Sequence, residues 1–211
     1  MVGLPTRIGS QLHEIDCIGD AMTKTIPIFH SLRAKGHPMA TFDIGGGLGV
    51  DYQKDDSEAV LERMRRYGKM IEALLAPLGC EILCEPGRVL VGPAGVLVGQ
   101  VEYVKKTPHK NFLITNLGMH QILRPALYQA HHRILPLCLN PGRTEKKYDV
   151  VGPICESADF LAKNRDLPES FPGDFLAVAD AGADAATMAS NYNAHPPAQE
   201  FLIDGTSIVE A

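Results

Sequence analysis

The sequence lacks the features of membrane-spanning, secreted and nucleic-acid-binding proteins. Its longest apolar runs, such as residues 95–101, are far too short to span a bilayer. Its first residues lack the charged start and the apolar core of a signal peptide. No block of Lys and Arg stands out, and the formal net charge is −5. We therefore expect no membrane contact and no nucleic-acid partner.

Sequence patterns of disulfide, metal and nucleotide sites are also missing. The five cysteines are an odd number and include no CxxC pair, which indicates reduced thiols in a cytoplasmic protein. No nucleophile elbow, P-loop or zinc pattern is present. The adjacent His131 and His132 would point in different directions in any regular element, so we expect no metal site there.

What remains is an ordinary globular composition of 211 residues, 45% hydrophobic and 21% charged, enough for one or two domains. The first ninety residues favour alternating strands and helices. Strands are expected at residues 2–8, 40–44 and 81–84, with helices at 14–35 and 56–75. Each strand runs into a polar or glycine-rich loop, which is typical of a βαβ arrangement with functional loops at the strand ends.

Two features of this half carry further expectations. Pro27 should kink the first helix or split it in two. The abrupt strand-like start at Val2, Gly3 and Leu4 suggests that an N-terminal portion is missing.

Beyond a boundary near residue 92 the pattern becomes β-rich. Strands are expected at residues 96–104, 111–115, 148–151, 174–178 and 200–203. A helical stretch fits Phe160–Lys163.

The stretch Phe42–Gly49 holds three consecutive glycines, Gly45, Gly46 and Gly47, directly after an apolar run. Such glycines let backbone N–H groups approach an anion, usually a phosphate. A plain turn that needs positive φ is the alternative.

Glu85 and Arg88 lie in a Glu-Pro-Gly-Arg turn after the next expected strand, where Gly87 permits close approach of a ligand to the backbone. Arginine suits phosphate, and a carboxylate could hold a protonated ring nitrogen. A surface salt bridge would explain the pair equally well. Ser10 could donate its hydroxyl to a phosphate or cap the helix that follows.

Two further segments could contact a substrate. Arg124 could bind a carboxylate with Tyr128 nearby, or Arg124-Pro125 could simply form a turn or start a helix. Cys155 and Glu156 could serve as a thiol acid/base and as a carboxylate that recognises an amine. The alternative is a helix N-terminus capped by Ser157 or Asp159, with Cys155 simply buried.

Taken together, these segments resemble diaminopimelate decarboxylase, among the pyridoxal-phosphate decarboxylases that share the alanine-racemase-like barrel. The matching pieces occur in family order along nearly the whole chain. They are Ile8-Gly9-Ser10-Gln11, Gly45-Gly46-Gly47-Leu48-Gly49, Glu85-Pro86-Gly87-Arg88, Arg124-Pro125-Ala126-Leu127-Tyr128, Cys155-Glu156-Ser157-Ala158-Asp159 and Ala189-Ser190-Asn191-Tyr192-Asn193.

The resemblance implies an α/β plus β fold. Residues 1–92 would form the C-terminal part of a (β/α)8 pyridoxal-phosphate-binding barrel, and residues 93–211 a β-rich C-terminal decarboxylase domain. It also implies decarboxylation of meso-diaminopimelate to L-lysine in lysine biosynthesis, with pyridoxal 5'-phosphate as cofactor.

Roles for individual residues follow from the same resemblance. The cofactor phosphate would be held by Ser10, Gly45, Gly46, Gly47 and the Gly87-Arg88 backbone. Glu85 would pair with the pyridine nitrogen. Substrate carboxylate would be bound by Arg88, Arg124 and Tyr128. Cys155 and Glu156 would reach the active site of the other subunit of a head-to-tail homodimer, where Glu156 would contact the distal amino group.

The chain departs from the family pattern at several positions. Arg7 replaces a histidine that stacks on the cofactor ring, Asn116-Leu117-Gly118 replaces Asp-Ala-Gly, and Asp184 replaces a tyrosine near the phosphate. The lysine to which the family attaches its cofactor lies on an early barrel strand outside this chain. The chain alone is therefore expected to be inactive. The alternative is a catalytically dead relative that binds and regulates an active decarboxylase through the inherited dimer surface.

Overall fold

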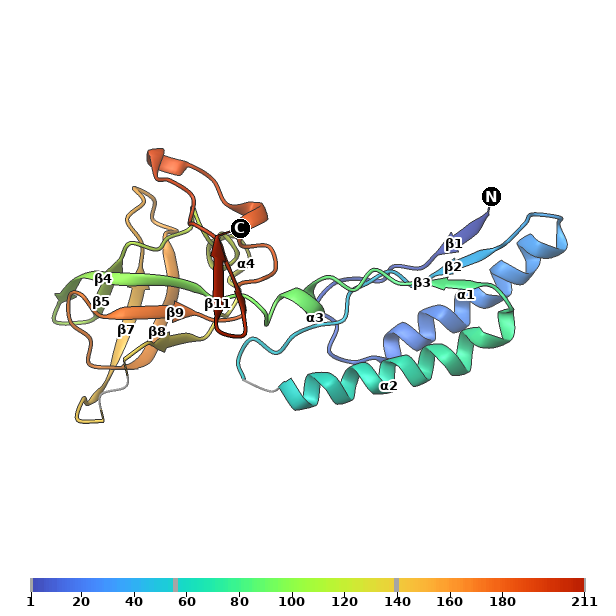
Figure 1. Ribbon diagram of the computed structural model, residues 1–211, viewed down its shortest axis with the longest axis horizontal. Helices are drawn as coiled ribbons and strands as arrows, with labels where there is room; N and C mark the ends of the chain where they lie inside the picture. Colours follow the sequence, from blue (N-terminus) through green and yellow to red (C-terminus); the bar gives the residue numbers. More distant parts are fainter. Residues whose placement is uncertain (1, 55–56, 139–140, 211) are drawn as a thin grey trace. The chain divides into compact units, whose positions relative to one another are not determined.

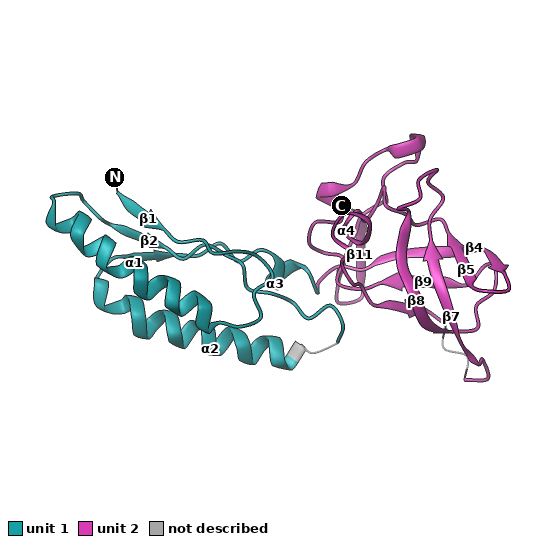
Figure 2. Ribbon diagram, turned by 180° about the vertical axis from the view of Figure 1, so that it is seen from behind, with its two compact units in different colours: residues 1–93 teal, residues 94–211 magenta. Residues whose placement is uncertain are grey.

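A computed structural model describes residues 2–54, 57–138 and 141–210. The chain divides into two compact units, Met1–Pro93 and Ala94–Ala211, coloured separately in Figure 2. Each unit has a buried apolar core of its own.

Unit 1 is a three-stranded parallel sheet in the order β1-β2-β3, with two long helices lying side by side on one face (Figure 1). Leu4, Phe42 and Ile82 occupy the same register across the sheet and all join the cluster under the helices. The elements are β1 Gly3–Pro5, α1 Asp16–Ala34, β2 Thr41–Asp43, α2 Ser57–Leu75, the 3-10 turn Ala76–Leu78, β3 Glu81–Leu83 and α3 Arg88–Val91. Asp56, expected in the first turn of α2, lies outside the described residues.

Helix α1 runs without interruption through Pro27, so the expected split does not occur. Met22 and Phe29 are fully buried on either side of the proline, and both pack in the same cluster. Burial of this face on both sides of Pro27 favours one continuous helix over two, despite the backbone hydrogen bond that proline cannot make.

Unit 2 is built on a six-stranded mixed sheet in the order β6-β9-β4-β5-β7-β8. Only the β5–β7 pair in this sheet is parallel within the described residues, and β6 also approaches β8, so the sheet is nearly closed. Its core includes Val101, Leu113, Tyr148 and Leu161. The elements are β4 Leu97–Lys106, β5 Asn111–Thr115, α4 Arg124–Tyr128, β6 Ile134–Pro136, β7 Glu145–Val151, β8 Phe160–Pro168 and β9 Phe175–Val178, followed by 3-10 turns at Ala186–Met188 and Tyr192–Ala194.

The helix expected at Phe160–Lys163 is wrong, because these residues begin strand β8. The apolar run Phe160-Leu161-Ala162 is too short for its periodicity to separate a helix from a strand. Pairing with β7 decides the outcome, since β8 follows β7 antiparallel along most of its length.

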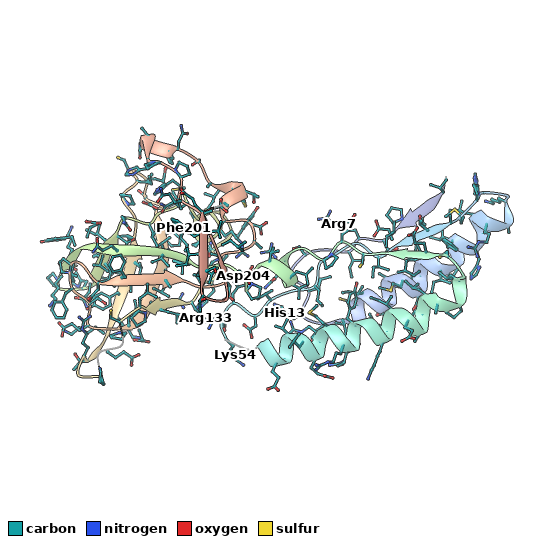
Figure 3. The ribbon with its side chains drawn as sticks, viewed as in Figure 1. Arg7, His13, Lys54, Arg133, Phe201 and Asp204 are labelled. Atoms are coloured by element: carbon teal, nitrogen blue, oxygen red, sulfur yellow. The ribbon has the colours of Figure 1, made fainter. Side chains whose placement is uncertain are left out.

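The last described elements are β10 Phe201–Asp204 and β11 Ser207–Glu210, which form a separate antiparallel hairpin. Phe201 and Asp204 mark the two ends of β10 in Figure 3. Gly205 takes a positive φ of 60° in the turn. Among the helices of the described residues, none has the length and apolarity needed to cross a membrane.

Candidate functional site

The glycine loop lies where the three strands of unit 1 end, and hydrogen bonds tie it to both neighbouring loops. Asp43 Oδ1 accepts a bond from the Gly45 N–H at 2.8 Å, which turns the chain sharply after β2. The Gly45 carbonyl accepts the Glu85 N–H at 2.8 Å, and the Gly47 carbonyl accepts the Leu12 N–H at 2.8 Å. The loop is therefore an ordered element of this edge of the sheet.

Close backbone packing is one reason for the glycines. A Cβ at Gly46 would lie 2.3 Å from the Glu85 carbonyl oxygen, and one at Gly47 would lie 2.5 Å from that of Gly9. Gly47 also has a φ of 102°, which favours glycine. The sequence pattern predicted only that an anion could approach or that the chain makes a plain turn. It gave no sign that three loops meet here too closely for any side chain.

The same loop presents donors without acceptors. Within the described residues, neither the Gly46 N–H nor the Gly47 N–H donates to a protein acceptor, and the Ser10 hydroxyl makes no hydrogen bond. Ser10 directly follows Gly9, whose carbonyl faces Gly47. It does not cap α1, because that helix begins at Asp16. Two adjacent N–H groups and a nearby hydroxyl are suited to binding phosphate oxygens.

The loop after β3 carries the other residues expected at a cofactor. Arg88 Nη1 donates to the Tyr52 hydroxyl at 2.8 Å, and Tyr52 is buried. Sequence reasoning missed Tyr52, because a contact between two separate loops leaves no local pattern. Glu85 is exposed beside the glycine loop. Arg7, labelled in Figure 3, follows β1 and borders Gly45.

Arg124 is buried in unit 2 with polar partners on two sides. Its Nη1 donates to His132 Nε2 at 2.7 Å, while His132 Nδ1 donates to the Ala179 carbonyl at 2.9 Å. This pairing assigns the His132 proton to Nδ1. Asp184 Oδ2 lies 3.7 Å from Arg124 Nε. Asp184, which stands where the family has a tyrosine, thus forms an ion pair with Arg124.

Tyr128 ends the short helix α4 and is 62% exposed. Pro125 lies in the first turn of that helix, so the expectation of a helix start at Arg124-Pro125 is confirmed. Gln129 then takes a left-handed conformation and ends the helix.

Cys155 and Glu156 lie in the loop between β7 and β8, and no helix starts there among the described residues. The Cys155 N–H donates to Asn193 Oδ1 at 2.9 Å. Asp159 accepts the Met119 N–H at 2.6 Å and the Ile154 N–H at 2.7 Å. The alternative of a helix capped by Ser157 or Asp159 is therefore wrong, and Asp159 instead joins two loops.

The expected site residues fall into separate sets. Those assigned to the cofactor all lie in unit 1. Those assigned to the substrate lie in unit 2, apart from Arg88.

His131 and His132 bond to Arg165 and Arg124 respectively. Within residues 2–54, 57–138 and 141–210, no group of three His, Cys, Asp or Glu side chains could hold a metal ion.

His120 is 2% exposed, and its Nδ1 has no hydrogen-bond partner among the described atoms. Its ring centroid lies 5.0 Å from that of His195. Burial, followed by the charge of His195, lowers the pKa of His120, while Asp159 raises it in part. The folded protein therefore favours neutral His120.

We expect the free energy of unfolding to decrease less in mild acid for His120→Leu than for the parent protein. The unfolded chain takes up the proton at its ordinary pKa of about 6.5, so the free energy of unfolding falls as the pH drops below that value. One such group contributes a slope of at most about 1.4 kcal/mol per pH unit. Urea unfolding between about pH 8 and about pH 5 should show a flatter profile for His120→Leu. The exposed His109→Leu should keep the parent profile, and equal slopes for all three proteins would contradict the assignment.

Comparison with known proteins gives the class of the chain. The family model described as "Pyridoxal-dependent decarboxylase, C-terminal sheet domain" matches residues 17–182. This chain belongs to the pyridoxal-dependent decarboxylases.

The relatives it resembles are diaminopimelate decarboxylases. That of Aquifex aeolicus is 38% identical over 208 residues, covering 99% of this chain and 49% of the relative. That of Vibrio cholerae is 41% identical over 210 residues, covering 96% and 48%. The solved structure of diaminopimelate decarboxylase from Helicobacter pylori complexed with L-lysine superposes with a TM-score of 0.89 at 38% identity, covering 99% of this chain and 50% of that one.

The chain spans about half the length of the curated relatives it matches. The family resemblance and the expected fold class, α/β followed by a β-rich part, are confirmed.

Proposed function

We propose that this chain is part of a pyridoxal-phosphate-dependent decarboxylase that converts meso-diaminopimelate to L-lysine. The observation that carries the proposal is the match to diaminopimelate decarboxylases over 96–99% of the chain at about 40% identity. The five cysteines are all free thiols, which is consistent with the cytoplasmic location we propose.

The residues of unit 1 fit the phosphate of the cofactor. The Gly46 and Gly47 N–H groups have no protein acceptor within the described residues, and Ser10 follows Gly9, whose carbonyl faces Gly47. Tyr52 holds the Arg88 side chain at the adjoining loop. We assign phosphate binding to these groups, with the Gly87-Arg88 backbone contributing.

When bound, pyridoxal phosphate supplies an acceptor for the electron pair left on the substrate as CO2 departs. Glu85, exposed beside the glycine loop, would hold a proton on the pyridine nitrogen. Arg7 borders the same loop and would present a fixed positive charge toward the ring.

Unit 2 would supply substrate contacts. Tyr128 is exposed, and Arg124 is held by His132 and Asp184, so we assign substrate carboxylate to Tyr128 and Arg124 together with Arg88. Cys155 and Glu156 are exposed on their loop, where they could meet the active site of a second copy. Glu156 would then attract the distal amino group of the substrate in a homodimer.

Cofactor binding by the 211-residue chain is the direct test. We expect pyridoxal phosphate to bind in equilibrium dialysis, and Ser10→Ala to weaken binding about tenfold, as expected for loss of a hydrogen bond to a charged group. Ser207→Ala in the β10–β11 hairpin should leave binding unchanged.

Two outcomes would redirect the proposal. Equal affinity for the parent and Ser10→Ala would remove the phosphate assignment. Absence of cofactor binding, together with capture of an active decarboxylase subunit, would favour the regulatory relative. The substitution of Arg7 for a stacking histidine is the observation that favours that second function.

A further inference from the structure

A cavity of about 460 Å³ lies in unit 2 between helix α4 and strand β8. It combines small apolar side chains with three nitrogen-bearing ones and one aromatic ring. Among the residues that line it are Ala126, Ala130, His131, Phe160, Lys163 and Arg165. A volume of this size accommodates a small metabolite.

Strand β8 carries a bulge beside this cavity. Tyr148 pairs with Arg165 and Val150 pairs with Ala162, so the single residue between them on β7 is opposed by two on β8. Asn164, in the bulge, has a φ of 52°. A bulge bends the strand and redirects its side chains, and here both Lys163 and Arg165 line the cavity.

Arg165 is partly buried, and its guanidinium is bonded to the imidazole of His131. Its Nη1 lies 2.5 Å from His131 Nε2, and its Nη2 lies 3.3 Å from His131 Nδ1. Within the described residues, no carboxylate forms a salt bridge with Arg165. Burial lowers the pKa of this guanidinium, but arginine keeps its charge at neutral pH. His131 thus positions the guanidinium at the cavity.

Lys163 adds a second cation at the same cavity. Its ammonium lies 3.7 Å from the centroid of the Phe160 ring. The neighbouring carboxylates have lysines of their own: Asp149 bonds Lys110 at 2.6 Å, and Asp166 bonds Lys147 at 2.7 Å. The cavity therefore keeps an excess of positive charge.

We propose that this cavity binds a small organic anion whose carboxylate or phosphate pairs with Arg165 and Lys163. Its apolar part lies against Phe160 and the alanines. The guanidinium offers paired donors to two oxygens, and the ammonium offers a point charge. The site is built entirely from α4, β8 and the residues that follow α4, and it uses none of the residues assigned above to cofactor or substrate.

The test is isothermal titration of the 211-residue chain at constant ionic strength. The probes are inorganic phosphate, phenyl phosphate, acetate and benzoate. We expect millimolar binding, tighter for the aromatic member of each pair, and the phosphate and carboxylate series distinguish which anion is preferred. Arg165→Gln should weaken binding about tenfold, and Lys163→Gln should weaken it to a smaller extent.

Two variants separate this site from general charge effects. Lys105→Gln removes an exposed cation on β4 and should leave binding unchanged. Ala130→Leu should fill the cavity, abolishing the preference for aromatic anions while the net charge stays constant. Unfolding curves verify that each variant folds, and Arg165→Lys provides a milder change if Arg165→Gln does not fold. Equal affinity for the parent and the folded Arg165 variant would overturn the proposal, as would an equal loss in Lys105→Gln.

Discussion

Gly46→Ala is expected to lower the free energy of unfolding of unit 1 by about 3 kcal/mol, the upper range for overpacking of a close contact. The new Cβ would lie 2.3 Å from the Glu85 carbonyl oxygen, a backbone atom that cannot rotate away. Relief requires the loop after β3 to move, which also displaces Glu85. Urea unfolding followed by the helical circular dichroism signal reports this change, because both long helices belong to unit 1.

Gly68→Ala is the matched control. Gly68 lies inside α2, and a Cβ there would meet nothing within 4 Å. Alanine should therefore stabilise the helix by up to about 1 kcal/mol, because glycine is the weaker helix former. The two substitutions add the same methyl group, but the expected changes in the free energy of unfolding have opposite signs. A Gly46→Ala protein as stable as its parent would show that the loops do not pack as described.

Asp159→Ala is expected to destabilise unit 2 by about 3–5 kcal/mol, because it leaves two backbone N–H groups without an acceptor. Asp159 is 5% exposed and accepts bonds from Met119 and Ile154, so both loops depend on one carboxylate. The expected result is an early loss of the unit 2 core in urea. Exchange of the Met119 and Ile154 amides with solvent deuterium measures the local effect, and both should exchange faster.

Two controls define the size of this effect. Asp159→Asn keeps one oxygen acceptor and should cost about half as much. Asp166→Ala removes an exposed carboxylate that pairs with Lys147, and should change stability by less than about 1 kcal/mol. If Asp159→Ala were no more costly than Asp166→Ala, the two loops would not depend on the buried carboxylate.

The fold was predictable from the sequence where apolar residues recur at regular spacing over a long segment. Helices α1 and α2 bury apolar residues at helical spacing over 19 residues each, which makes them visible in the sequence. Strand β8 was missed because Phe160-Leu161-Ala162 is short and its structure depends on pairing with a distant strand. The split expected at Pro27 was wrong because local rules do not include the buried face on either side of it.

The candidate site was predictable where one loop carries a compact motif. Gly45–Gly47 and Glu85 were identified directly from the sequence, and these loops pack together through their backbones. Tyr52, His132 and Asp159 were harder to assign, because each acts through a partner far away in the chain. Residue types reveal the chemistry that is available, whereas partners appear only once the chain has folded.

The strand order of unit 2 also affects how the chain folds. Strand β4, the first of the unit, pairs with β9, the last strand of its main sheet, and β9 in turn pairs with β6. The β4–β9 pairing joins residues separated by most of the unit, so the chain must close a long loop before the sheet is complete. In unit 1 each parallel strand pairs with the next strand in sequence. We therefore expect completion of the unit 2 sheet to be the slow step of folding, because during synthesis β4 lacks its partner until β9 has been made.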